Sequence, residues 1–149
     1  MKKFILLIIL TILAISSCEK DDICLENTTP MLIIRFNDTD NPTEKKAVNS
    51  LTVWAVGKDS LYTNKSLDSI VLPLNLNENN TIFKFRSDEI IDEIDVTYDR
   101  KDIFISRSCG FITTFENLQF SSSTNWIKGY SINNTIIENE TATHITIFH

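Results

Sequence analysis

The sequence is poor in the residues on which catalysis and phosphate binding depend. Its 149 residues include two histidines, three glycines, three prolines and three cysteines. Such a composition offers little material for imidazole base catalysis, a multi-histidine metal centre or a glycine-rich phosphate loop. Neither a Gly-x-Ser-x-Gly nor a His-Glu-x-x-His motif occurs. We therefore expect a protein that is not an enzyme and that uses no cofactor.

Basic residues are also scarce relative to acidic ones. The chain has 14 Lys and Arg against 20 Asp and Glu, a net charge of −6, and Lys2 and Lys3 lie before Cys18. The remainder carries 12 cations and a net charge of −8. An acidic body without a basic stripe is repelled by a phosphate backbone, so nucleic-acid binding is disfavoured. The length and the 42% apolar and 23% charged content are those of one soluble globular domain.

Long apolar runs are absent except at the N-terminus. A Met-Lys-Lys start, an apolar stretch over residues 4–15 and a small pair before Cys18 have the order of a secretory signal over residues 1–17. The apolar stretch is shorter than the roughly 20 residues that a membrane-spanning helix needs. Ile-Ser-Ser-Cys at residues 15–18 resembles the lipobox of bacterial lipoproteins. The resemblance implies thioether attachment of a diacyl lipid with palmitate-type chains to Cys18, cleavage before it, and usually N-acylation of the new terminus. A plain secreted protein cut near Ser17, or an uncleaved anchor, is the alternative.

An acidic run with one lysine, Glu-Lys-Asp-Asp at residues 19–22, follows Cys18. It is either a solvated charged linker or similar to the export signal that carries lipoproteins of the Bacteroidota to the cell surface. We expect an outer-membrane location, with surface display and inner-leaflet attachment both open. The expected organisation is a lipoprotein signal peptide over residues 1–17, a lipidated tether over residues 18–27 and one β-sandwich domain over residues 28–149.

The two cysteines that remain after lipidation are Cys24 and Cys109, in a compartment that permits disulfides. We predict that they pair; two buried free thiols are the alternative. A bridge between them closes a loop of 85 residues, for which the chain-entropy model gives roughly 4 to 5 kcal/mol. Only five residues separate Cys18 from Cys24, a reach of roughly 20 Å at most. The folded body is therefore expected to lie close to the membrane.

The rest of the chain has the pattern of short β-strands. Residues 99–102 are typical of a hairpin turn, residues 88–93 of a single helical turn, and Pro73 marks an edge strand or a bulge. About nine strands at this spacing predict an all-β fold, an antiparallel β-sandwich of immunoglobulin-like or similar type with eight or nine strands. Because glycine is scarce, we expect Asn, Asp and Ser to form the turns. The predicted strands are residues 31–36, 51–56, 70–74, 81–85, 94–98, 103–105, 111–115, 130–137 and 144–148.

Several local motifs together carry a resemblance to a known group of proteins. They are Asp-Asp-Ile-Cys at residues 21–24, Thr-Thr-Pro-Met-Leu-Ile-Ile-Arg-Phe at 28–36, Cys-Gly-Phe at 109–111, Phe-Glu-Asn-Leu at 115–118 and His-Ile-Thr-Ile-Phe at 144–148. As a set they resemble an uncharacterised family of small Bacteroidota lipoproteins, a domain of unknown function, over nearly all of the mature chain. The resemblance implies an envelope location and a compact β domain, and it supplies no activity and no site residues.

Aromatic side chains offer one candidate binding surface. Trp54 and Trp126, with Tyr62 and Tyr130, are the residue types that stack on sugar rings, so the two tryptophans are the candidate glycan-binding residues. Packing in the core or at an interface is the alternative, because aromatic residues on strands commonly pack.

Two serines are candidates for covalent modification. Ser60 and Ser69 each follow an aspartate and precede an apolar residue, a pattern that looks like the acceptor of the Bacteroidota O-glycan pathway. Ordinary Asp-Ser turn chemistry explains the same residues.

We assign no metal site. Residues 37–41 and 88–102 supply the oxygen ligands that calcium prefers, but Pro42 stands where a third ligand is needed, and solvated turns explain both segments equally well. His144 and His149 point to opposite sides of an extended strand, so they form no local metal pair.

These observations favour a lipid-anchored envelope protein that works as a non-enzymatic binding or structural module. Its expected partners are the membrane, through the anchor, and a protein of the envelope. Glycan capture by exposed aromatic residues is the alternative, and the solvent exposure of Trp54 and Trp126 discriminates between them.

Overall fold

The computed structural model describes Cys24 and residues 29–149. The predicted signal peptide, the predicted lipidation site Cys18 and most of the predicted tether lie outside the described residues. The described residues form nine strands: β1 (Leu32–Asn37), β2 (Val48–Ala55), β3 (Ser60–Leu67), β4 (Ser69–Leu72), β5 (Asn80–Ser87), β6 (Ile90–Ser106), β7 (Gly110–Ser122), β8 (Gly129–Ile132) and β9 (Ile145–Phe148). Within the described part of the chain, no helix is long and apolar enough to cross a membrane.

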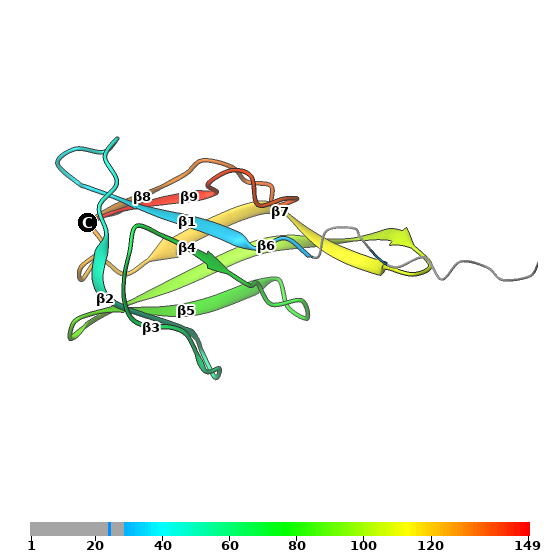
Figure 1. The fold of residues 1–149 in the computed structure, drawn as a ribbon, viewed down its shortest axis with the longest axis horizontal. Helices are drawn as coiled ribbons and strands as arrows, with labels where there is room; N and C mark the ends of the chain where they lie inside the picture. Colours follow the sequence, from blue (N-terminus) through cyan, green and yellow to red (C-terminus); the bar gives the residue numbers. More distant parts are fainter. Residues whose placement is uncertain (1–23, 25–28) are drawn as a thin grey trace, which may run out of the picture.

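The strands form two sheets packed face to face, so the predicted β-sandwich is confirmed (Figure 1). One sheet has the order β4-β1-β9-β8 and the other the order β3-β2-β5-β6-β7. All pairings are antiparallel except that of β1 with β9, which is parallel. The chain crosses from one sheet to the other four times, between β1 and β2, β3 and β4, β4 and β5, and β7 and β8.

The core lies between the sheets and is built by alternation along the strands. Phe36 of β1 contacts Phe85 of β5 across the interface, with ring centroids 6.4 Å apart in an edge arrangement that aromatic pairs favour. Inward residues of β5 and β6 are fully buried while their neighbours are half-exposed or exposed, as expected for strands with one face on a core. The buried apolar residues include Leu32, Ile34, Leu51, Val53, Ile70, Leu72, Phe83, Ile94, Val96, Phe115, Leu118, Ile127, Ile137, Ile145 and Ile147.

The predicted hairpin turn at residues 99–102 is wrong. These residues lie inside β6 and pair with β7, with Asp99 opposite Glu116 and Asp102 opposite Thr113. The turn that joins the two strands is at residues 107–109. The charged sequence is typical of a turn, but here it belongs to a length of strand whose side chains face solvent.

One further prediction of local structure is wrong, and one strand was not predicted. Residues 88–93 form no helical turn, because Asp88 has a positive φ of 52° that ends β5 in a tight turn, and β6 begins at Ile90. The sequence also gave no sign of β3. All but two of its eight residues are exposed, so it carries no apolar periodicity.

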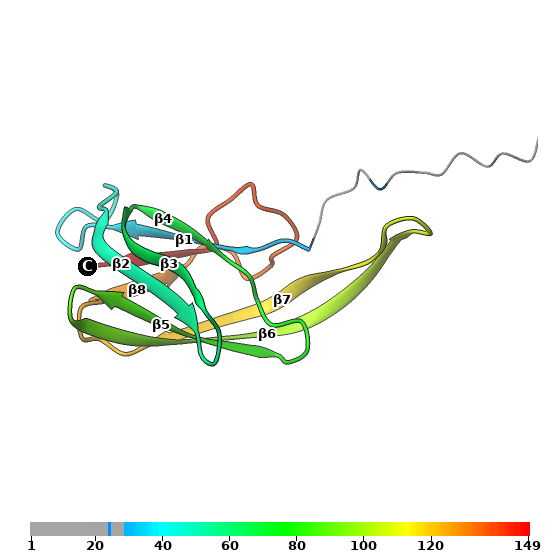
Figure 2. The same cartoon turned by 60° about the horizontal axis from the view of Figure 1, so that its bottom comes forward.

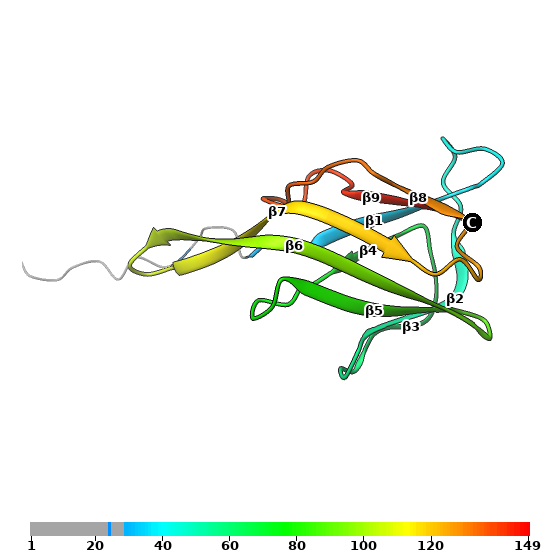
Figure 3. The ribbon, with the colours of Figure 1, turned by 180° about the vertical axis from the view of Figure 1, so that it is seen from behind.

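β6 and β7 continue past the sandwich as a two-stranded arm, which we define as residues 101–114 (Figures 2 and 3). A β-bulge marks its base: the register passes from Thr97 opposite Gln119 to Asp99 opposite Glu116, which leaves one extra residue in β7. Asn117 takes up a positive φ of 54° there and its side-chain amide donates to Asp99 at 2.7 Å. Because a bulge bends and twists its strand, it turns the arm away from the body.

A disulfide fastens the tip of this arm to the start of the described chain. Cys24 and Cys109 are bonded, with Cα atoms 5.0 Å apart, so the predicted pairing is present. The amide of Thr113 donates to the hydroxyl of Thr29 at 3.1 Å. The chain segment that precedes β1 is therefore joined to the arm at two points, far from the C-terminal end of the molecule (Figure 1).

Candidate functional site

A hollow that we name the edge groove lies beside the end of β2 and the edge strand β3. It has a volume of 780 Å³ and is open to solvent. Three apolar side chains stand exposed along it: Val56 (55%), Leu61 (43%) and Leu76 (47%). Its other lining residues include Ala55, Lys58, Leu74, Asn75, Glu78 and Ile82. An open, mainly apolar hollow with a few polar groups has the composition of a binding site.

One wall of the edge groove is held rigidly by β6. The hydroxyl of Tyr98 donates to the carbonyl oxygen of Asn75 at 2.9 Å and lies 2.7 Å from the hydroxyl of Thr81, which accepts from the amide of Asn75 at 2.9 Å. Burial raises the pKa of Tyr98, which keeps the phenol neutral. Arg100 adds bonds to the carbonyl of Leu76 and the side chain of Asn79. The groove is therefore preformed, which lowers the entropy lost on binding.

Trp54 lies in a second, smaller hollow on the outer face of the five-stranded sheet. The hollow has a volume of 340 Å³ and is also lined by Thr52, Lys58, Asp59, Ser60 and Arg86. The indole is half-buried, and Arg86 donates to the hydroxyl of Thr52 at 3.3 Å. One aromatic ring among charged and hydroxyl groups retains the residue types that contact a sugar.

Trp126, in contrast, belongs to the core, so its prediction as an exposed glycan platform is wrong. Its side chain is 9% exposed and its indole N–H donates to the carbonyl of Phe85 at 3.1 Å. The ring packs against Phe36 and His149, with centroids 6.3 and 5.7 Å away. Burial of the large apolar indole stabilises the core, so the alternative interpretation, core packing, holds for Trp126.

The two histidines have structural partners. His144 is buried, its Nδ1 accepts from the amide of Ile33 at 3.0 Å, and its own amide donates to the carbonyl of Ile33 at 3.0 Å. Burial lowers the pKa of His144, although the nearby Glu140 opposes this. Burial likewise lowers the pKa of His149, whose Nε2 lies 3.1 Å from the carbonyl of Lys46. The ring of His144 therefore extends the pairing of β1 with the chain before β9.

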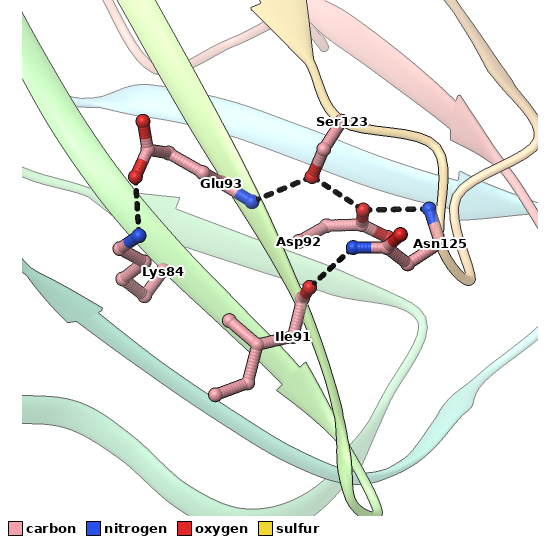
Figure 4. A network of polar contacts seen from close by, with 6 residues as sticks. All are labelled: Lys84, Ile91, Asp92, Glu93, Ser123 and Asn125. Carbon is pink, nitrogen blue, oxygen red and sulfur yellow. Dashed lines mark hydrogen bonds and ion pairs between the residues drawn. The ribbon is translucent and has the colours of Figure 1, made fainter.

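A buried carboxylate organises the link between the two sheets (Figure 4). Asp92 is 0% exposed, and its oxygens accept from the hydroxyl of Ser123 at 2.6 Å and from the amides of Asn125, Trp126 and Ile127 at 2.8, 2.9 and 2.9 Å. Burial alone would raise the pKa of Asp92, but the hydrogen bonds from Ile127, Ser123 and their neighbours outweigh it and lower the pKa. Each of these bonds stabilises the charged form of Asp92. Because the four donors belong to residues 123–127, they fix the chain after β7 and leave the carboxylate no free acceptor for a ligand.

Several side chains of the first segment considered for calcium have local partners. The carboxylate of Asp38 accepts from the amide of Asp40 at 2.8 Å and pairs with Lys46 at 3.4 Å, and the side-chain amide of Asn37 donates to the carbonyl of Pro42 at 2.6 Å. Across Cys24 and residues 29–149, no three His, Cys, Asp or Glu side chains gather in a way that could hold a metal ion.

Ser60 and Ser69 are both exposed, at the start of β3 and of β4. The hydroxyl of Ser69 donates to the carboxylate of Asp68 at 2.9 Å, a contact expected for Asp-Ser turn chemistry. O-glycosylation of these residues stays a prediction.

Comparisons with known proteins place the chain at the level of the family. No curated protein and no solved structure matches it. A family model described as a family of unknown function (DUF6452) matches residues 50–149, so the expectation of an uncharacterised family is confirmed. The match takes in the edge groove, the Asp92 network and the whole arm, and the chain belongs to the family of unknown function DUF6452.

Proposed function

We propose that this protein is a lipid-anchored outer-membrane lipoprotein that acts as a non-enzymatic binding module for a protein of the cell envelope. The observation that carries the proposal is the edge groove, because Val56, Leu61 and Leu76 are exposed around a preformed hollow of 780 Å³. Apolar side chains of a partner would remove this surface from water, a gain of about 25 cal/mol per Å².

The chemistry of the described residues agrees with binding. The imidazole of His144 is committed to the backbone of Ile33, and the carboxylate of Asp92 is committed to four donors. The charged residues that line the edge groove, Lys58 and Glu78, supply a polar rim around an apolar centre. This arrangement is typical of interfaces between proteins.

The anchor part of the proposal rests on the sequence. Cys18 follows a signal-like segment, and only five residues lie between it and Cys24, which is bonded to the arm. A tether of this length reaches about 20 Å at most. A partner of the edge groove would accordingly be an integral or peripheral protein of the same membrane.

Site-specific photocrosslinking in intact cells tests the proposed partner. A photoreactive residue at position 76 is expected to give a discrete adduct, and the same residue at position 136 is expected to give none, although Ile136 is 43% exposed against 47% for Leu76. Adding Leu61→Asp, which places a charge in the groove, should abolish the adduct. Equal crosslinking from both positions, or an adduct that survives Leu61→Asp, would contradict the groove as the binding site.

Glycan binding remains a second candidate because of the hollow around Trp54, Arg86 and Asp59. It now depends on one tryptophan. Binding of an envelope or host polysaccharide that is lost in Trp54→Ala and kept in Leu76→Asp would support this candidate over the first one. Binding unaffected by Trp54→Ala would remove it.

A further inference from the structure

The far end of the arm exposes more apolar surface than a soluble hairpin needs. Phe104 is 56% exposed and Phe111 is 67% exposed, the largest value among the exposed apolar side chains of the described residues. The two residues are directly opposite each other in β6 and β7 and their rings are in edge contact, with centroids 5.2 Å apart. The neighbouring rung pairs Ile103 with Ile112, and Ile103 is 38% exposed.

These two rungs form a short apolar band, which we name the tip band (Phe104, Phe111, Ile103 and Ile112). The next rung towards the body is polar, because the hydroxyl of Thr113 donates to Asp102 at 2.7 Å. The two rungs are about 3.3 Å apart and their side chains point to opposite faces of the hairpin, so the band surrounds the arm. Its height fits within the roughly 5–10 Å that interfacial elements reach into the headgroup and acyl boundary.

The position of the tip band relative to the proposed anchor is fixed by covalent bonds. Phe111 lies two residues from Cys109, Cys109 is bonded to Cys24, and Cys24 is six residues after Cys18. If Cys18 carries the lipid, the disulfide holds the tip band within a few residues of the bilayer surface. A short tether of this kind gives the tip band a high effective concentration at the bilayer surface.

Cations flank the band on both sides. Arg107 is exposed in the turn at the end of the arm. Lys101 is exposed on the rung before the polar pair, where it also pairs with Glu116 at 3.2 Å. An apolar band bordered by basic side chains suits a phospholipid surface, because the rings enter the acyl boundary while the cations stay at the phosphates.

We propose that the tip band of the arm is a second membrane contact, in which Phe104 and Phe111 insert into the interfacial layer of the bilayer that holds the lipid anchor. This inference rests on the proposed function, since it takes Cys18 as the anchor. In this arrangement the arm spaces the body from the bilayer and sets its orientation, because the arm lies between the sandwich and the lipid.

Fluorescence quenching by lipids brominated near the top of their acyl chains tests the contact. The full protein is purified from its own membranes as Phe111→Trp and, as a matched control, Ile90→Trp, then placed in vesicles of phosphatidylethanolamine and phosphatidylglycerol. Ile90 is 50% exposed and follows the β5–β6 turn, at the opposite end of the body from the arm. Wild type gives the background from Trp54 and Trp126.

We expect the added indole of Phe111→Trp to lose most of its emission in brominated vesicles and that of Ile90→Trp to lose none. No quenching at position 111 overturns the inference, including the case of a blue-shifted but unquenched indole, which would mean that a protein or a second copy covers the band. A Phe104→Ser, Phe111→Trp variant should show weaker quenching than Phe111→Trp; equal quenching counts against insertion of the rings.

The intact mass of the same preparations separates this inference from the proposed anchor. A lipidated protein without quenching at position 111 refutes the membrane contact and leaves the anchor standing. A protein without lipid refutes the anchor, and quenching at position 111 on addition of the brominated vesicles then supports the contact by itself, while its absence refutes both.

Discussion

The inner and outer halves of the β6–β7 hairpin share their strands but not their surroundings. In the body, Ile94, Val96 and Phe115 are fully buried against the second sheet. In the arm, Phe104 and Phe111 lie in the same two strands and are more than half exposed. An isolated two-stranded hairpin is marginally stable in water. Burial therefore accounts for the inner half and the disulfide holds the outer half, whose apolar rings are left for the proposed membrane contact.

Removing the disulfide should have the largest effect on this contrast. A Cys24→Ser, Cys109→Ser variant is expected to lose about 4 to 5 kcal/mol of unfolding free energy, because the bridge closes a loop of 85 residues in the unfolded chain. Urea unfolding gives the free energy, and hydrogen exchange over residues 101–114 should show lost protection there first. The urea midpoint of the variant should equal that of wild type treated with reductant, because both lack the Cys24–Cys109 bond. Equal midpoints for oxidised wild type and the variant would contradict a stabilising role of the disulfide.

Two phenylalanines of the same strand test the contrast directly. Phe115→Ala leaves a cavity beside Tyr98, whose ring centroid is 5.0 Å away, and should cost about 3–5 kcal/mol. Phe111→Ala should change stability by less than about 0.5 kcal/mol in solution. Both values come from urea unfolding of the purified variants. A large loss for Phe111→Ala would mean that the arm has packing partners in the folded body.

The Asp92 network, at the end of the body opposite the arm, allows a comparison of a buried polar group with an exposed ion pair. Asp92→Asn removes the charge that three amides and a hydroxyl satisfy and should cost about 2–4 kcal/mol, because hydrogen bonds to a charged group are lost and buried donors are left unpaired. The matched control is Glu93→Gln, which breaks only the exposed pair with Lys84 and should cost less than about 1 kcal/mol.

The same network predicts a pH dependence at acidic pH. The pKa of Asp92 is lowered in the folded state, so its contribution is present above the unfolded pKa of about 3.9 and is lost as the pH falls through the folded pKa. Thermal melts between neutral and strongly acidic pH should therefore show a loss of stability that is smaller in Asp92→Asn. Parallel curves for the two proteins would be inconsistent with a charged Asp92.

A weaker pH dependence is expected from His144. Burial lowers its pKa in the folded state, so the unfolded chain binds the extra proton first and stability falls as the pH drops below about 6.5. Protonation of Nδ1 removes the acceptor for the amide of Ile33, which costs about 1 kcal/mol, the contribution of one hydrogen bond. His144→Asn keeps an acceptor and does not titrate, so the acid-side loss of stability should be smaller by about this amount. Melting curves of both proteins measure the difference; an unchanged slope would assign the dependence to other groups.

The sequence predicts strands well where one face is buried. The alternation of Ile94, Val96 and Tyr98 identified the inner part of β6, and the apolar run before Asn37 identified β1. Where both faces are wet the signal disappears, which is why β3 was missed and why the outer part of β6 was taken for a turn at residues 99–102. The expected turn chemistry holds at Asp88, whose positive φ lies in the β5–β6 turn, whereas the positive φ of Ser50, Asn64 and Asn117 lies inside β2, β3 and β7.

The candidate sites were less predictable than the fold. The exposed residues of the edge groove, Val56, Leu61 and Leu76, come from three separate segments, and no local pattern marks residues that only the tertiary structure gathers. The tip band did leave a trace: Ile103 and Phe104 precede a turn and Phe111 and Ile112 follow it, so apolar residues border the turn on both sides. Without the length of the arm, that trace cannot be distinguished from a strand inside the core.

The proposed position of the domain at the membrane depends on a lipid attached to Cys18. Metabolic labelling of cells with an alkynyl palmitate, followed by isolation of wild type and Cys18→Ser, tests it most directly. We expect the wild-type protein to be labelled and to occur in the membrane fraction. The Cys18→Ser protein should be unlabelled and absent from that fraction. An unlabelled wild type, or equal labelling of the two proteins, would contradict it.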